Sequence, residues 1–174
     1  MQWLLYALLT VFTWGLYGVF LHSGQMAMGD PVFGRYKSFL FVGLAYFLFA
    51  VLAPLVLLKA QGATWTFPPK GIWISLFAGT LGAIGAFGTL LAFGAKGTPT
   101  VVMSIVFAGA PIVNAIVATW MHPPKSLAAV PWQFYLGIAM AAVGGCLVSL
   151  YRPAPAAKPA TAAAKAAPVQ PGRS

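Results

Sequence analysis

Acidic residues are nearly absent from this sequence: Asp30 is the single Asp or Glu among 174 residues. Only 6% of the residues are charged and 60% are hydrophobic, whereas about a quarter of an ordinary soluble domain is charged. So few polar side chains could not cover the surface of a water-soluble protein of this size. The scarcity of charge therefore argues against a soluble globular domain and indicates a membrane protein.

The same scarcity limits the chemistry that the chain can perform. His22 and His122 stand at the ends of hydrophobic segments, so no histidine or carboxylate lies deep inside one. Intramembrane hydrolysis and carboxylate-based proton exchange both need a titratable group at the site. The sequence also shows no metal-binding cluster, catalytic triad or phosphate-binding glycine loop. We therefore expect no enzymatic activity, no metal and no cofactor.

Cysteine is almost absent as well. Cys146 is the only one, so an intramolecular disulfide is excluded. Because it stands inside a hydrophobic segment, its simplest interpretation is a small packing residue.

Long hydrophobic runs are what the sequence has in abundance. A transmembrane helix needs about 20 predominantly apolar residues to cross a hydrocarbon layer roughly 30 Å thick. Five segments meet this requirement without a Lys, Arg, Asp or Glu, namely residues 3–22, 38–58, 71–94, 100–121 and 130–151. The first exceeds the apolar stretch of about 7–15 residues in a cleaved signal peptide, so we expect it to be retained. The sequence predicts an all-α membrane protein, with a bundle of five transmembrane helices over residues 1–151 and a disordered Ala/Pro/Lys-rich tail over 152–174.

Positive charge exceeds negative charge by a formal +9. Basic residues that bind nucleic acid cluster on one face or stripe, whereas these stand singly at segment ends and in the tail. Anchoring in a lipid bilayer explains this pattern better, and no nucleic-acid partner is expected. One side of the predicted bundle carries Lys59, Lys70 and Lys125. The other carries Arg35, Lys37 and Lys96, to which the tail adds Arg152, Lys158, Lys165 and Arg173.

This distribution bears on orientation, because Lys and Arg beside transmembrane helices favour the cytoplasmic side. The full count of seven against three favours a cytoplasmic C-terminus. Without the residues after the last segment the count is three against three, so insertion in both orientations stays an alternative. We expect a multi-pass protein of the cell's inner (plasma) membrane.

Two segments carry small residues at regular spacing. In segment 130–151 they recur every four residues, at Gly137, Ala141, Gly145 and Ser149. In segment 71–94 they recur every three residues, at Gly79, Gly82, Gly85 and Gly88. Small residues let helix backbones approach closely in a membrane. These faces are predicted to pack against another helix, either of the same chain or of a second copy.

Polar and aromatic side chains mark two further segments, at positions 6–17 and 104–114. The candidate lining of a substrate cavity consists of Tyr6, Thr10, Thr13, Trp14, Tyr17, Ser104 and Asn114. The tyrosines and threonines share one face of the first helix, and Asn114 follows Pro111 by three residues inside the fourth. The alternative is that the hydroxyls bond neighbouring carbonyls, the rings fill packing gaps and Asn114 joins two helices.

Short motifs also follow one another in a characteristic order. Trp14-Gly15 is followed by Asp30-Pro31 and then by Arg35. GTLG at 79–82 leads to AFGAK at 92–96, and a proline-bearing AGAPIV at 108–113 precedes a glycine-rich stretch at 137–145. Over residues 3–151 these motifs resemble one half of an EamA-like transporter of the drug/metabolite transporter superfamily, whose first helix opens with a WG, P and R pattern.

The resemblance implies a transporter that works by alternating access. Typical members carry two five-helix halves of inverted topology, whereas this chain has one, so the resemblance implies pairing with a second copy or a related half. The chain also departs from the family at 122–125, where His-Pro-Pro-Lys replaces the usual Gly-Glu. Members of the small multidrug-resistance branch rely on a glutamate in the first helix, which is absent here.

A half-size, dimeric transporter of a small neutral or zwitterionic metabolite is the function that the sequence favours. The predicted cavity suits such molecules because it offers hydrogen bonds and aromatic contact without a charge. A non-transporting membrane subunit that stabilises or regulates a partner stays an alternative. So does a component of a flippase for a lipid-linked substrate.

Overall fold

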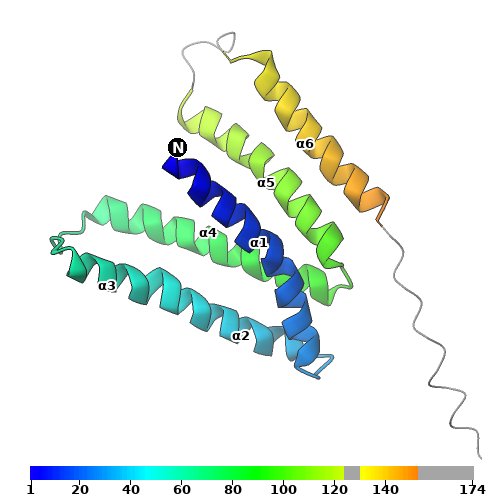
Figure 1. Cartoon of the computed structure of the whole chain (residues 1–174), viewed down its shortest axis with the longest axis horizontal. Coiled ribbons are helices and arrows are strands. Elements are labelled where there is room, and N and C mark those ends of the chain that lie inside the picture. Colours follow the sequence, from blue (N-terminus) through cyan, green and yellow to red (C-terminus); the bar gives the residue numbers. More distant parts are fainter. Residues whose placement is uncertain (124–129, 153–174) are drawn as a thin grey trace, which may run out of the picture.

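Helices make up almost all of the described chain, which comprises residues 1–123 and 130–152 of a computed structural model (Figure 1). They are α1 (Gln2–Ala27), α2 (Gly34–Phe47), the π-helical η1 (Leu48–Leu52), α3 (Ala53–Ala60), α4 (Pro69–Gly94), α5 (Pro99–Met121) and α6 (Trp132–Leu150). Because α2, η1 and α3 continue one another, the described residues contain five helices that are long and apolar enough to cross a membrane. The predicted all-helical content is confirmed for these residues. The predicted tail lies, from residue 153 onward, outside them.

The first helix is longer than the sequence predicts. The predicted apolar segment ends at His22, whereas α1 continues to Ala27. The additional turn packs against α2, where a Cβ on Gly24 would lie 3.2 Å from Oγ of Ser38. Tertiary packing of this kind outweighs the low helix propensity of glycine and serine. The chain then turns at Gly29, whose φ of +67° is one that glycine adopts readily.

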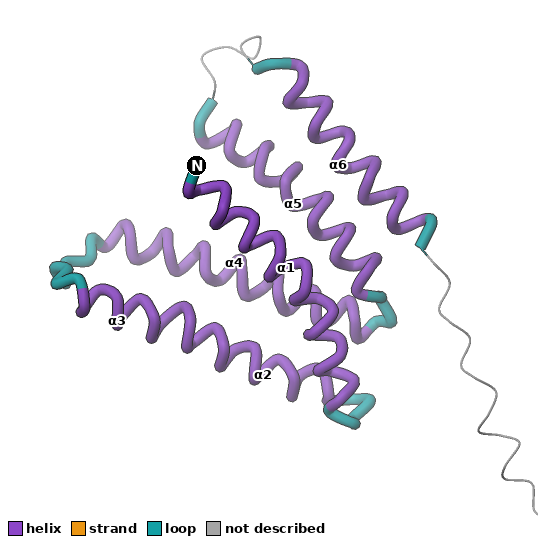
Figure 2. Tube along the Cα trace, in the orientation of Figure 1, coloured by secondary structure: helices purple, strands orange, loops and turns teal. Residues whose placement is uncertain are grey.

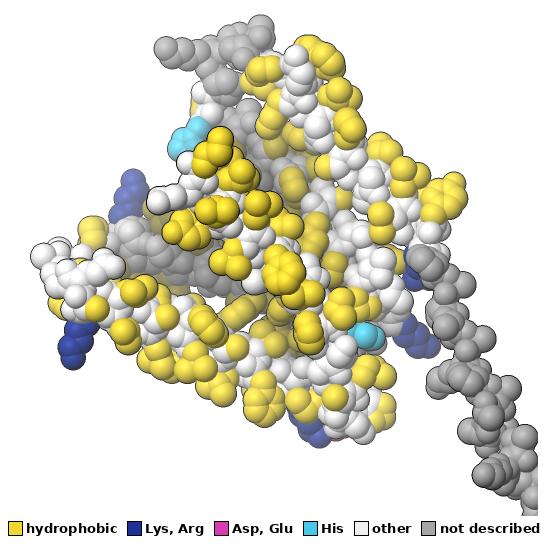
Figure 3. Space-filling model, in the orientation of Figure 1, with side chains coloured by type: hydrophobic (Ala, Val, Ile, Leu, Met, Phe, Trp, Pro, Cys, Tyr) yellow, Lys and Arg dark blue, Asp and Glu magenta, His cyan; other side chains and the backbone are white. Residues whose placement is uncertain are grey.

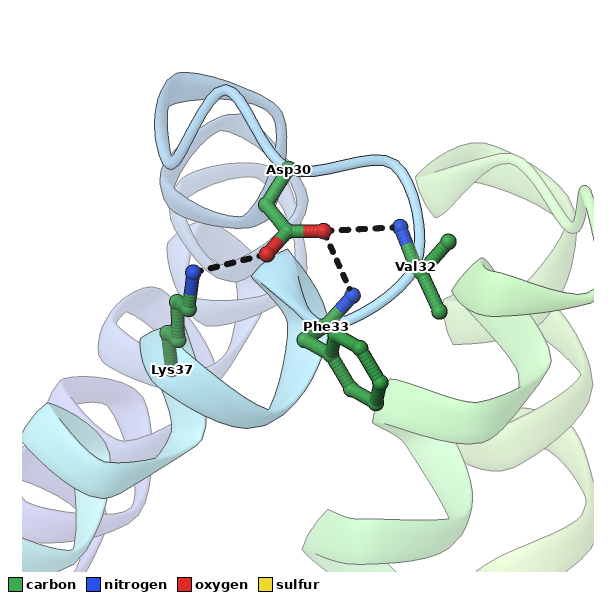
Figure 4. Close-up of polar contacts among 4 residues, drawn as sticks. All are labelled: Asp30, Val32, Phe33 and Lys37. Carbon is green, nitrogen blue, oxygen red and sulfur yellow. Dashed lines mark hydrogen bonds and ion pairs between the residues drawn. The ribbon is translucent and has the colours of Figure 1, made fainter.

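Asp30 organises the start of the second helix (Figure 4). Its Oδ1 accepts hydrogen bonds from the backbone N–H groups of Val32 and Phe33, with N···O distances of 3.0 and 2.8 Å. Its Oδ2 accepts a hydrogen bond from Nζ of Lys37 at 2.7 Å. Side-chain oxygens of aspartate commonly stabilise a turn in this way. The turn occupies residues 31–33, and α2 begins at Gly34, four residues before the predicted apolar segment 38–58.

The α2–α3 rod, which consists of α2, η1 and α3 in succession, contains Pro54 in its interior. Pro54 lacks an N–H, and a proline ring clashes with the carbonyl four residues earlier, here that of Ala50. Ala50 lies in η1, directly before α3. A π-helical turn is wider than an α-helical one, so the helix passes the proline without ending.

The helices form a fan (Figures 1 and 2). The α2–α3 rod lies beside α4, α5 lies beside α6, and these two pairs converge where α4 leads into α5. Helix α1 contacts α2, α4 and α5, whereas α6 contacts only α5 among the described helices. The helices therefore contact one another mainly at the convergent end of the fan and through α1.

The buried core is small and sits where the helices converge. It consists of Leu21 from α1, Leu90 and Phe93 from α4, and Met103 from α5. Leu90 alone is completely buried. Helix α1 can approach α5 closely because Gly18 has no side chain: a Cβ there would lie 2.7 Å from Sδ of Met103.

Most large apolar side chains point outward instead (Figure 3). Trp3, Trp73 and Trp120 are 72%, 69% and 81% exposed. In Figure 3 apolar side chains cover the helices along their length, and the Lys and Arg side chains lie at the margins. The exterior is therefore apolar along the helices and basic near their ends.

Candidate functional site

The polar face of α1 is uncovered along the first half of the helix. Oγ1 of Thr10 donates to the carbonyl oxygen of Tyr6, and Oγ1 of Thr13 donates to that of Leu9, each at 2.9 Å. Both threonines thus satisfy their donors on their own helix, as the structural alternative expects. Each hydroxyl oxygen keeps a lone pair for an incoming donor. The Tyr6 ring is 67% exposed, so this part of the face is free of contact with the chain's other described helices.

Trp14 and Tyr17 lie further along the same helix, where α1 meets α5. Their ring centroids are 6.1 Å apart, and the Trp14 ring packs edge-on to Phe107 at 6.4 Å. The Tyr17 hydroxyl is buried and faces the Tyr46 hydroxyl of α2, which is close to it but outside ideal hydrogen-bond geometry. Tyr17 borders a groove of about 360 Å³ between α1 and α2. Because an unsatisfied buried hydroxyl is costly, either Tyr46 or a polar group that enters this groove is expected to bind it.

Ser104 and Asn114 lie on α5 at different depths. Oγ of Ser104 donates to the carbonyl oxygen of Thr100 at 2.6 Å. Ser104 and Phe107 border a groove of about 320 Å³ between α1 and α5. Asn114 lies ten residues further on, about 15 Å along the helix axis, and its side chain is exposed.

The structure brings three of the seven predicted cavity residues together. Trp14 links Tyr17, in the α1–α2 groove, to the α1–α5 groove that Ser104 borders. The other three residues of the α1 face continue toward the N-terminus, and Asn114 lies apart on α5. The seven residues thus occupy neighbouring surfaces and not one enclosed cavity of the single chain.

The small residues of α6 divide into two groups. A Cβ on Gly145 would collide with Cβ of Ala108 on α5. Oγ of Ser149 donates to the carbonyl oxygen of Gly145 at 2.8 Å. Around Gly137, by contrast, no atom of a neighbouring described residue lies within 4 Å of where a Cβ would stand, and Ala141 is exposed. The C-terminal half of the stripe packs inside the chain and the N-terminal half is left uncovered.

The glycine face of α4 makes no close contact inside the described chain. Its members Gly79, Gly82, Gly85 and Gly88 each leave the space of a Cβ empty to 4 Å. Other residues of the same helix are buried, among them Ala86, Leu90 and Phe93. Gly79 and Gly82 share the helical face of the buried Ala86 and Leu90, so they are open because the neighbouring helices diverge from α4 toward its N-terminal end. Gly85 and Gly88 turn away from that face.

Sequence reasoning did not assign a role to the polar groups at the α1–α2 connection. The Lys37 ammonium, followed by the Phe33 N–H, lowers the pKa of the Asp30 carboxyl from 3.8 to about 2. Nearby, His22 Nδ1, Gln25 Oε1 and Arg35 Nε are buried without hydrogen-bond partners in residues 1–123 and 130–152. The sequence signals for this region are the motif residues Asp30, Pro31 and Arg35 and the run of polar residues between two apolar segments. No group of His, Cys, Asp and Glu in the same residues could hold a metal ion.

No protein-family model, curated protein or solved structure matches this chain.

Proposed function

We propose that the chain is a half-size membrane transporter of a small neutral or zwitterionic metabolite, and that two copies form the working unit. The observation that carries this proposal is a set of five membrane-length helices whose polar α1 face and glycine α4 face are both left uncovered by the chain itself. A complete single-chain pore would cover such faces with its own helices. The order of the sequence motifs supports the same conclusion by resemblance.

Residence in a lipid bilayer is supported by the apolar exterior. A soluble monomer rarely exposes contiguous apolar patches beyond a few hundred Å². Here large apolar side chains are exposed along every one of the five helices. Lipid tails cover such a surface without cost, whereas water does not.

The orientation follows from the basic residues. Arg35, Lys37, Lys96 and Arg152 stand where α1 meets α2, where α4 meets α5 and where α6 ends. These three places share one end of the fan, since successive helices alternate in direction. We assign this end to the cytoplasmic side of the inner membrane, because positive loops are retained there.

A second copy is supported by the uncovered small-residue faces. Helices associate in lipid mainly through close packing, which glycine and alanine permit. The α4 glycines and the Gly137 end of α6 are available for such packing. Their pairing across two copies would enclose the α1 face between chains and create the substrate cavity.

The chemistry of the α1 face indicates the class of substrate. Its groups are hydroxyls and aromatic rings, and the five helices carry no carboxylate. Such a surface recognises neutral or zwitterionic molecules through hydrogen bonds and ring contacts. Of these groups, the Tyr17 hydroxyl is buried, and a polar ligand would compete with Tyr46 for it.

Transport by the purified full-length protein in liposomes tests the proposal. We expect at least one member of a panel of radiolabelled neutral and zwitterionic metabolites to enter faster than into protein-free liposomes. Tyr17→Phe should slow uptake about tenfold, because it removes one hydrogen bond to the substrate and keeps the ring. Tyr151→Phe, at the C-terminal end of α6 and 79% exposed, is the matched control and should leave uptake unchanged. Uptake of no panel member would contradict transport.

A second pair of variants tests the depth of the cavity. Asn114→Leu should reduce uptake, since it removes the amide of α5, whereas Val113→Leu next to it should not.

Native mass measurement with crosslinking then separates the transporter from a non-transporting subunit. Self-pairing supports the proposal, and obligate pairing with a different protein would overturn it.

A further inference from the structure

Arg35 is a cation for which the chain supplies no side-chain carboxylate. The only acidic side chain is that of Asp30. Both of its oxygens are engaged, one by two backbone N–H groups and the other by Lys37 (Figure 4). A guanidinium stays protonated at any physiological pH. The counter-charge of Arg35 must therefore come from a group other than an acidic side chain of this protein.

The Arg35 side chain is held against the end of α4. A Cβ on Gly94, the last residue of α4, would collide with Nη1 of Arg35 and lie 3.0 Å from its Cδ. The guanidinium carbon also lies 5.1 Å from the centroid of the Tyr36 ring. Nε is buried and has no partner in the described part of the chain. The guanidinium is thus fixed in place but its hydrogen-bonding capacity is not used up.

Capping of α4 does not account for this position. A cation near a helix C-terminus is favourable because the last carbonyls carry partial negative charge. Here the carbonyls of Leu91, Ala92 and Phe93 already accept backbone hydrogen bonds. The N–H groups of Ala95, Lys96 and Gly97 donate at 2.9, 3.1 and 2.9 Å to three carbonyls in the last turn of α4. The helix dipole favours Arg35 at this end but leaves its donors free.

Two polar side chains from α1 lie in the same region with unused polar atoms. The His22 ring packs edge-on against Phe93, the neighbour of Gly94, at 5.4 Å between centroids. Nδ1 of His22 and Oε1 of Gln25 are buried and unpartnered among the described residues. His22 can carry its proton on Nδ1, and the Gln25 amide can rotate to present its NH₂ group. Together with Arg35 they place three polar groups with unused hydrogen-bonding capacity at the junction of α1, α2 and the end of α4.

We propose that this junction of α1, α2 and the end of α4 binds a phosphate-type oxyanion, with Arg35 as the principal ligand and His22 and Gln25 as additional donors. Guanidinium groups pair with phosphate through two parallel hydrogen bonds. The surrounding charge favours an anion. Lys37 neutralises Asp30, so Arg35 and Lys96 leave a net positive charge at this end. The oxyanion is either a lipid headgroup phosphate or a free phosphate. This site is independent of the transport proposal.

Two binding measurements on the full-length protein distinguish the two sources. In an uncharged detergent, titration with inorganic phosphate reports a free anion through a saturable rise in melting temperature. In nanodiscs of phosphatidylcholine with or without phosphatidylglycerol, native mass spectrometry reports a retained anionic lipid. We expect saturable binding in at least one of these two measurements. The measurement that detects it identifies the oxyanion as a free phosphate or a lipid headgroup.

Arg35→Gln should weaken this binding about tenfold or more, because it removes charge-assisted hydrogen bonds. Lys96→Gln is the matched control: it removes the same charge at the same end and should change the affinity by less than about twofold, as expected for an exposed charge. Equal weakening by the two variants would show general attraction to a basic surface and overturn the proposal. Absence of Arg35-dependent binding from both arms would overturn it as well.

A second set of variants keeps every charge. These variants test the site even when the Arg35→Gln protein does not fold. Gly94→Ala should weaken binding because the new methyl displaces the guanidinium from the end of α4. Gly71→Ala, in open space near the other end of α4, should not. Gln25→Leu should weaken binding too, since it removes a donor. Wild-type affinity in both Gly94→Ala and Gln25→Leu would refute the assignment.

Discussion

At the scale of single residues, most hydroxyls in the long helices bond to their own helix. Thr80 and Thr89 donate to the carbonyls of Leu76 and Gly85, four residues earlier, as Thr10 and Ser104 do elsewhere. This local bond lets a hydroxyl exist in an apolar helix without a partner from another element. The Tyr17 hydroxyl differs, because tyrosine cannot reach its own backbone carbonyls.

The Asp30–Lys37 pair leads to the first residue-scale prediction. Lys37→Met should raise the pKa of the Asp30 carboxyl, because Lys37 makes the largest contribution to lowering it to about 2. The value should stay below 3.8, since the N–H groups of Phe33 and Val32 still donate to Oδ1. Carbon-13 NMR in detergent micelles can follow this titration cleanly, because Asp30 is the only side-chain carboxyl.

The pH dependence of this contact follows from the direction of the pKa shift. A carboxyl with a lowered folded-state pKa stabilises the fold above its unfolded value, here 3.8, and this stabilisation is lost as pH falls toward 2. The α1–α2 turn should accordingly loosen only in that acidic window. Lys96→Met, which removes a charge at another connection, serves as the control. A rise of the Asp30 pKa in that variant as large as in Lys37→Met would argue against a specific contact.

At the scale of elements, α6 depends on a single neighbour. It packs only on α5 within the described residues, and Gly145 provides the closest approach. A side chain there would meet Cβ of Ala108 and the carbonyl oxygen of Ser104, the latter at 3.3 Å from the new Cβ. Backbone atoms cannot move aside as the end of a flexible side chain can.

Gly145→Val is therefore expected to destabilise the protein by about 1–3 kcal/mol, the usual cost of overpacking. For a chain of this size that corresponds to a fall in melting temperature of about 2–10 °C. Gly144→Val is the matched control, because the space beside Gly144 is open and the change in helix propensity is the same. Thermal unfolding in detergent, followed by circular dichroism, compares the two. Equal melting temperatures would contradict the packing of α6 on α5 at this glycine.

At the scale of the whole molecule, the fan has more apolar surface than core. Four side chains form the buried cluster, while each long helix exposes large apolar residues. In water this balance could not support the fold, because burial of apolar surface is the dominant favourable term in folding. In lipid the same surface is compatible with the surroundings, and close packing at glycines becomes decisive.

The five membrane-length helices lead to a whole-molecule prediction: when each of them crosses the bilayer once, the two ends of the chain lie on opposite sides of the membrane. Tags at both ends of the full-length protein, probed with a protease before and after the membrane is opened, measure this. We expect the C-terminal tag to be protected in intact cells and the N-terminal tag to be cleaved. Insertion in both orientations would make each tag partly accessible. Accessibility of both tags, or of neither, on every chain would contradict five crossings.

The sequence by itself determined the number and approximate bounds of the helices. Charge-free apolar runs of about 20 residues have few alternatives to helix, since a helix satisfies its backbone hydrogen bonds internally. Local composition misplaced only the α1–α2 connection, where Gly24 packs against Ser38 and keeps the helix going to Ala27. That contact joins residues of two helices, so no local pattern could indicate it.

Only the tertiary structure decided which equivalent residues meet a neighbour. Tyr6 and Tyr17 belong to one stripe, yet the first is exposed and the second carries a buried hydroxyl. Gly137 and Gly145 share another stripe, yet only the second touches α5. Helical periodicity tells which side chains share a face. Which part of that face is covered depends on where the neighbouring helices diverge, and that is set by contacts between residues far apart in the chain.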